Sequence, residues 1–107
     1  MKYGFVKVAA AIPLVKVADC QFNAQQASRL IIDAESKGVQ VIIFPELNLT
    51  GYSCGDLFGQ SLLLEQAEMA LMQVMNETRQ LDIISIVGMP VVVNSTLMNC
   101  AVAFQLV

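Results

Sequence analysis

Short apolar segments alternate with helical patterns along this chain, and their lengths and spacing predict the elements of a sheet. Four segments have the length and composition of strands: residues 3–12, 41–44, 83–87 and 98–104. The continuous apolar run at 41–44 suits a strand that is buried on both faces. Gly88 and Pro90 are expected to bend the chain after the third strand, so that residues 91–93 continue it or begin another. The turn-forming residues 94–96 then predict an antiparallel hairpin with the last segment.

Two helices are predicted between the first three strands. Asn23 is expected to cap the first helix, with Gln26 as its partner, and Gly38 to end it in the left-handed conformation. One apolar stripe of this helix comprises Ala27, Leu30, Ile31 and Ala34. The second helix is predicted over residues 60–80, with an inward face of Leu63, Ala67, Ala70, Leu71, Val74 and Thr78. Its methionines are expected to fill gaps or to form an oligomer contact, and they are Met69, Met72 and Met75.

The predicted order β-α-β-α-β-β places the chain in the α/β class with a mixed sheet. A helix between two strands lets them pair in parallel, and such units are almost always right-handed, so we expect the first three strands to be parallel. The final hairpin is antiparallel. No internal repeat, linker or low-complexity segment interrupts the 107 residues, so we expect one small domain or part of a larger one.

Composition narrows the functional classes. The chain is 56% hydrophobic and 14% charged, which is apolar for an isolated surface, so we expect more protein to cover part of it. A net charge of −3 without a basic cluster argues against nucleic-acid binding. Apolar stretches such as residues 86–93 are much shorter than the roughly 20 residues of a membrane span. Residues 8–15 could imitate a secretory signal, but a strand explains them as well, and we expect a cytoplasmic protein.

The residues that bear chemistry are few. The three cysteines show no metal-type spacing and suit a reducing compartment, and the absence of histidine excludes Ser-His-Asp chemistry and His-ligated metal sites within these residues. Glu46 lies just after the buried strand 41–44, at the carboxyl end where α/β sheets form ligand crevices. Phe44, Leu47, Leu49 and Tyr52 would withdraw it from water, as suits a general base. The alternative is a glutamate at a strand end that simply faces water.

The segment FPELNLTGYSCGDLF, residues 44–58, resembles the first catalytic segment of the nitrilase superfamily. TGYSCGDLF, running into a helix, is similar in particular to the glutamine-hydrolysing domain of glutamine-dependent NAD synthetases. The similarity extends from Lys7 to the end of the chain. It implies the first half of the nitrilase-type four-layer α-β-β-α sandwich, with residues 1–107 as the N-terminal part of a glutaminase domain.

The resemblance also implies roles for individual residues. Glu46 matches the proton acceptor of a Glu-Lys-Cys triad, whereas the Lys and the nucleophilic Cys of the family follow residue 107. Cys54 occupies a position that the family uses structurally. Tyr52 matches a residue that lines the glutamine pocket, although an aromatic that anchors its own loop is the alternative. Asp56 is expected to shape its loop or cap a helix. Asn99 resembles a strand asparagine that helps to hold the site, and the alternative is an asparagine that only satisfies backbone groups.

For the whole protein, the resemblance implies hydrolysis of L-glutamine and transfer of ammonia to a C-terminal ATP-dependent synthetase domain that amidates deamido-NAD. ATP and Mg²⁺ would belong to that absent domain, and no cofactor or metal is expected in these residues. A homo-oligomer is expected from the apolar surface. The alternatives are a free-standing nitrilase-type amidase that acts on another small amide and a non-catalytic, oligomerising α/β module.

Overall fold

A computed structural model describes residues 4–51 and 61–105 of the chain. Its elements follow the predicted order: β1 (Val8–Ala10), α1 (Cys20–Ser36), β2 (Val41–Ile43), α2 (Ser61–Glu77), β3 (Ile84–Val93) and β4 (Thr96–Phe104). β1 and β2 are shorter than the apolar runs predicted, and β3 is longer.

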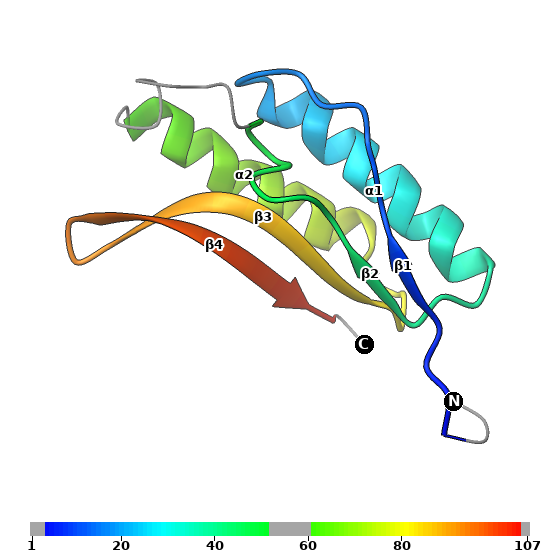
Figure 1. Cartoon of the computed structure of the whole chain (residues 1–107). Coiled ribbons are helices and arrows are strands. Elements are labelled where there is room, and N and C mark those ends of the chain that lie inside the picture. The colour runs from blue at the N-terminus through cyan, green and yellow to red at the C-terminus, as the bar shows by residue number, and fades with distance from the viewer. Residues whose placement is uncertain (1–3, 52–60, 106–107) are drawn as a thin grey trace.

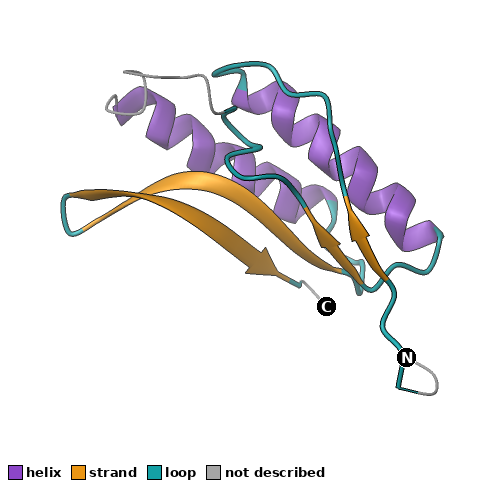
Figure 2. Ribbon diagram, viewed as in Figure 1, coloured by secondary structure: helices purple, strands orange, loops and turns teal. Residues whose placement is uncertain are grey.

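The four strands form one mixed sheet in the order β1-β2-β3-β4, as predicted. β1 pairs in parallel with β2 and β2 with β3, whereas β3 and β4 are antiparallel. Because each crossover advances one strand in the same direction, right-handed connections place both helices on the same face. Figures 1 and 2 show α1 and α2 side by side over one face of the sheet, and the β3–β4 hairpin extends past the shorter strands.

The core lies between the helices and this face of the sheet. Alanines at the buried positions of α1 and α2 have small side chains, which lets the two helices pack closely against each other. The predicted stripes are confirmed, with Leu30 and Leu71 half-buried at their margins. The fully buried larger side chains of this core are Ile31, Ile42, Leu49, Val74, Val87 and Met89.

The first helix begins earlier than predicted, at Cys20, and its N-cap is Asp19. The Asp19 carboxylate accepts a hydrogen bond from the Phe22 backbone N–H at 3.1 Å. The prediction that Asn23 caps the helix is therefore wrong. Asn23 is buried inside the first turn, where its amide exchanges hydrogen bonds with the Lys16 backbone and donates to the Leu49 carbonyl at 3.0 Å. It ties the loop before α1 to the loop after β2.

β3 continues through Gly88 and Pro90 to Val93. The predicted end of this strand at residue 87 is therefore wrong, and the alternative that residues 91–93 continue it is confirmed. The carbonyls of Ile86 and Gly88 face the β2 side, where they accept from Phe44 and Leu49. The backbone nitrogen of Pro90 faces the same side as Ile86 and Gly88. Because β2 has already ended at this point, the N–H that proline lacks would have had no partner on β2. Asn94 and Ser95 both have positive φ, at 51° and 65°, and make the predicted turn to β4 a two-residue turn of type I′.

In the described part of the chain, neither helix has the length and hydropathy that a membrane crossing requires.

Candidate active site

Glu46 follows β2 in a tight turn. The Phe44 N–H still donates to Ile86 on β3 at 2.9 Å, and the chain then reverses at Pro45, whose carbonyl accepts from the Asn48 N–H at 3.3 Å. Leu47 has a φ of 53°, and its carbonyl accepts from Gly51 at 2.7 Å. The turn therefore sends Glu46 out of the sheet immediately past the carboxyl end of β2, where the sequence placed it.

Asn99 on β4 holds the Glu46 carboxylate, because its side-chain amide donates to Glu46 Oε1. The two residues are far apart in the sequence, and the mixed sheet brings them together. Asn99 pairs across from Pro90, whereas Val102 and Phe104, which alternate with it along β4, pack against the helical core. The side chain of Asn99 therefore lies on the sheet face that is turned away from the helices. The expectation that Asn99 helps to hold the site agrees with this contact.

The expectation that apolar neighbours withdraw Glu46 from water is wrong for the described residues. Glu46 is exposed. Phe44 and Leu49 are buried, but they lie in the core on the helix side of the sheet. Strand alternation and the turn at Pro45 separate them from the carboxylate, which faces the side that the described residues leave uncovered.

Gly88 on β3 is a site residue that the sequence analysis treated only as a bend. A Cβ atom at this position would lie 2.8 Å from the Pro45 carbonyl oxygen and 3.0 Å from the Glu46 carbonyl carbon, and closer still to the Leu47 nitrogen. Only glycine therefore lets the Glu46 turn rest on β3. An isolated glycine inside an apolar strand was the available signal, since it often marks a close backbone approach.

Asn48 was also missed. It is 2% exposed, and its Oδ1 accepts a hydrogen bond from the Gly88 N–H at 2.7 Å. The Leu49 N–H donates to the Gly88 carbonyl at 3.1 Å, so both backbone groups of Gly88 are bound by the loop. The sequence showed only a turn-forming residue at position 48.

The other predicted site residues lie elsewhere. Tyr52, Cys54 and Asp56 lie outside the described residues. Cys20 is buried at the start of α1, and Cys100 shares a sheet face with the core-facing Val102 rather than with Asn99.

The lysines within the described residues make other contacts. Lys7 donates to the Lys37 carbonyl, Lys37 pairs with Asp33 at 3.0 Å, and Lys16 lies 4.2 Å from the centroid of the Phe22 ring. Of the three groups that the resemblance implies for a triad, the carboxylate is the one that the described residues would supply.

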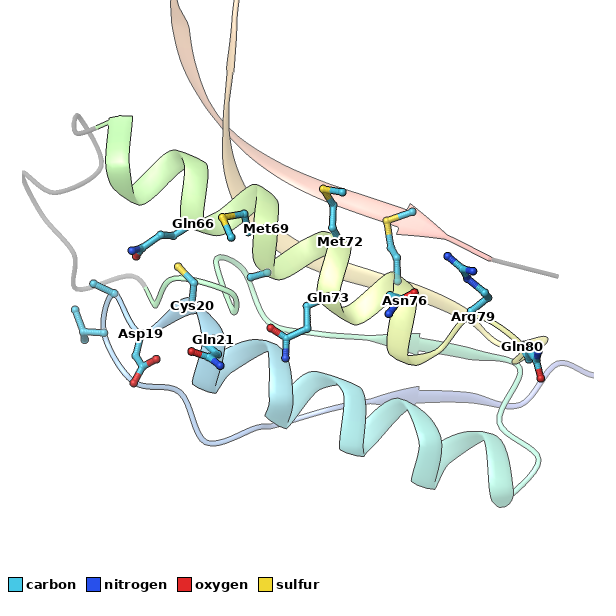
Figure 3. A pocket seen from close by; sticks show the side chains of 14 residues that line it. Asp19, Cys20, Gln21, Gln66, Met69, Met72, Gln73, Asn76, Arg79 and Gln80 are labelled. Carbon is cyan, nitrogen blue, oxygen red and sulfur yellow. The ribbon is translucent and has the colours of Figure 1, made fainter.

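A groove in the helical layer is separate from this site. Figure 3 shows it along α2 and the start of α1, lined among others by Gln66, Met69, Met72 and Cys20. Glu46 and Asn99 meet at the opposite face of the sheet, so the groove is not the candidate site. Met69 and Met72 are 68% and 67% exposed, so the expectation that they fill gaps is wrong. The alternative expectation, that they form an oligomer contact, stays a prediction.

Comparison with known proteins gives the context of the site. The profile of the family described as carbon-nitrogen hydrolase matches residues 7–106. A protein of Mycobacterium leprae named glutamine-dependent NAD(+) synthetase is 35% identical over 99 residues, which are 92% of this chain and 15% of that relative. A relative of the same name from Aquifex aeolicus is 38% identical over 74 residues, 69% of this chain and 13% of that protein.

Solved structures agree on the fold. A glutamine-dependent NAD(+) synthetase from Cytophaga hutchinsonii superposes with a TM-score of 0.86 at 24% identity, covering 94% of this chain and 17% of that one. An amidase from Nesterenkonia sp. superposes with a TM-score of 0.77 at 19% identity, covering 94% of this chain and 38% of that one. The predicted nitrilase-type α/β fold and the resemblance to NAD synthetases are thus confirmed. The chain spans about 15% of the length of the first of these relatives.

Proposed function

Because this chain belongs to the carbon-nitrogen hydrolase family, we propose that it is the N-terminal part of the glutaminase domain of a glutamine-dependent NAD synthetase. The similarity to relatives of that name over most of the chain supports the proposal. The amidase shares the fold at lower identity, and no residue described above favours its activity over glutamine hydrolysis.

The observation that carries the proposal is the carboxylate of Glu46 at the carboxyl end of β2, oriented by Asn99. In glutamine hydrolysis a Cys thiolate attacks the side-chain amide, and ammonia leaves. Glu46 would accept the thiol proton and return it to the departing amine, and a Lys would stabilise the oxyanion. An oriented carboxylate suits this shuttle, because the proton must pass between two fixed positions. The Lys and the Cys would come from sequence beyond residue 107.

Tyr52 is proposed to line the pocket for L-glutamine, six residues after Glu46. An aromatic side chain offers an apolar wall for the methylene groups of glutamine and a hydroxyl for its polar ends. This role rests on the resemblance.

The open face of the sheet supports the proposal that this chain is part of a larger domain. Several large apolar side chains on it are exposed: Val8, Ile43, Ile84, Val92 and Leu97. An exposed apolar sheet face of this kind calls for a covering layer. In the nitrilase-type sandwich a second sheet would provide that layer, and it would also withdraw Glu46 from water.

The remaining partners concern the whole protein. Glutamine-derived ammonia would pass to a C-terminal synthetase domain that uses ATP and Mg²⁺ to amidate deamido-NAD. The described residues contain no group of three Cys, Asp or Glu side chains that could hold a metal ion. Mg²⁺ would be held in the synthetase domain, as the resemblance implies. The exposed Met69 and Met72 on α2 support a homo-oligomer. We place the enzyme in the cytoplasm, where its dinucleotide substrate would be found.

The test uses the longer protein that carries this chain, with the nitrogen source as the variable. Glu46→Gln should lower glutamine-driven NAD formation by about 10²- to 10⁴-fold, because the proton shuttle is lost, and leave ammonia-driven formation unchanged. Glu65→Gln, an exposed glutamate on α2, is the matched control and should change neither rate. Hydrolysis of another amide without NAD formation would instead identify a free-standing amidase. Full glutamine-driven activity in Glu46→Gln would contradict a catalytic role.

A further inference from the structure

The turn that carries Glu46 rests directly on the backbone of β3. At Gly88 there is no room for a Cβ atom, because the Pro45 oxygen would lie 2.8 Å away and the Glu46 carbonyl carbon 3.0 Å away. Contacts this close to backbone atoms cannot be relieved by a side-chain rotation. The position of the Glu46 main chain is therefore set by the path of β3.

Asn48 also holds the Glu46 turn against β3. In a regular sheet, the Gly88 N–H would bind a carbonyl of the neighbouring strand. β2 has already ended here, and the side-chain oxygen of Asn48 takes the place of that carbonyl at 2.7 Å. The next residue restores a backbone bond, from Leu49 N–H to Gly88 C=O at 3.1 Å. Asn48 therefore lets the chain leave the sheet at Glu46 and return at Leu49 while the buried Gly88 N–H stays paired. The side-chain nitrogen of Asn48 itself meets no hydrogen-bonding partner among the described residues.

The turn also has a strained residue. Leu47, between Glu46 and Asn48, has a φ of 53°, in the left-handed region that is unfavourable for a non-glycine residue. Such a conformation persists when surrounding bonds determine it. Here the Asn48 N–H donates to the Pro45 carbonyl, the Gly51 N–H donates to the Leu47 carbonyl, and the Asn48 side chain accepts from Gly88. Without the Asn48 bond, the turn would relax toward ordinary φ values.

We propose that Asn48 is a positioning residue for Glu46. Its bond to Gly88 fixes the strained turn on β3, and the turn aims the Glu46 carboxylate at the Asn99 amide across the sheet. The carboxylate is thus held from two sides, through its main chain by Asn48 and Gly88 and through its side chain by Asn99. This inference rests on the proposed role of Glu46 in proton transfer.

The experiment measures the carboxylate position and the rate separately, in the longer protein. With asparagine labelled by ¹⁵N, the Asn99 side-chain amide resonance reports its bond to Glu46, and Glu46→Ala gives the position of that resonance when the bond is absent. In Asn48→Ala, the resonance should move toward the Glu46→Ala position. The kcat for glutamine hydrolysis should fall about tenfold to a hundredfold with KM little changed, because misplacement by about 1 Å has an effect of this size.

Thr78→Ala is the matched control. It also removes a buried hydrogen bond to the main chain, from Thr78 Oγ1 to the Val74 carbonyl at 2.8 Å, but at the end of α2. It should lower stability without changing the Asn99 resonance or kcat. Should Asn48→Ala not fold, Asn48→Leu, which has a similar size but offers no acceptor to the Gly88 N–H, is compared with the same control.

Two results would overturn the proposal: an unchanged Asn99 resonance in the folded Asn48 variant, or an equal change in Thr78→Ala. These outcomes differ from a failure of the proposed function, in which Glu46→Gln keeps glutamine-driven activity or the wild type has none. The resonance comparison remains decisive in either case, because it does not depend on turnover.

Discussion

The two faces of the sheet are built from the same strands but differ in what covers them. On the helix side, alternate residues such as Ile42, Val87 and Met89 are buried against α1 and α2. On the other side, Ile43, Val92 and Leu97 are exposed, and the polar pair Glu46 and Asn99 lies among them. Figure 1 shows no helix over this second face within the described residues.

The difference shows how one strand can serve packing and chemistry at once. Because side chains alternate between faces, a stable core on one side constrains the backbone, and the backbone then fixes groups on the other side. The helix-side core provides rigidity, whereas the open face provides the carboxylate. A site on rigid strands is placed more accurately than a site on a free loop.

The largest expected difference between the two faces is in the stability cost of replacing two adjacent isoleucines on β2. Ile42 is 2% exposed and Ile43 is 42% exposed. Ile42→Ala should lower the free energy of unfolding by about 2–5 kcal/mol, because it leaves a cavity in the core. Ile43→Ala should cost about 1 kcal/mol or less in the 107-residue chain, since water already reaches this side chain. Urea unfolding measures both.

The same pair sharpens the comparison in the longer protein. If a second sheet covers the open face there, Ile43→Ala should become as destabilising as Ile42→Ala. Equal small costs for Ile43→Ala in both lengths of protein would contradict the proposed covering layer.

The next largest effect is expected for the substitution of Asn99, and it concerns the rate of glutamine hydrolysis rather than stability. Asn99→Ala should lower kcat for glutamine hydrolysis about tenfold or more, because the Glu46 carboxylate loses the amide that orients it. The unfolding free energy of the 107-residue chain should change by about 0.5 kcal/mol or less, since the side chain is exposed there. Steady-state kinetics and urea unfolding test the two parts. Asn76→Ala, an exposed asparagine on α2, is the control, and an equal loss of kcat there would remove the case for Asn99.

Much of the fold could be predicted because it depends on local periodicity. The stripes of α1 and α2, the parallel strands and the final hairpin follow from residue spacing. The N-cap Asp19 was missed because Asn23 also has a side chain that can cap a helix. Only the tertiary hydrogen bond from Asn23 to Leu49 shows that Asn23 links two loops instead. The passage of β3 through Pro90 depends on where β2 ends, which spacing along β3 does not reveal.

The candidate site was predictable in part for the same reason. Glu46 could be placed at a strand end from the chain alone, and the resemblance pointed to Asn99. The exposure of Glu46 and the packing of its turn against Gly88 depend on how the end of β2 packs against β3. Such contacts join residues about 40 positions apart, as Asn48 and Gly88 do, and no local pattern encodes them.

The smallest effect, on the free energy of unfolding, is expected for the substitution of Ser85. It tests whether the side chains on the helix-side face stabilise the fold by apolar packing only. It lies on β3 opposite Ile42, it is 1% exposed, and its hydroxyl meets no hydrogen-bonding partner among the described residues. An unpaired buried hydroxyl is unfavourable, and alanine would remove it at the loss of one small atom. Ser85→Ala should therefore leave the free energy of unfolding unchanged or raise it by about 1 kcal/mol, as measured by urea unfolding, with Thr78→Ala as the contrasting loss of a paired hydroxyl. A marked destabilisation by Ser85→Ala would mean that the hydroxyl is paired in the longer protein, and that the helix-side face, like the open one, carries a polar contact that the fold depends on.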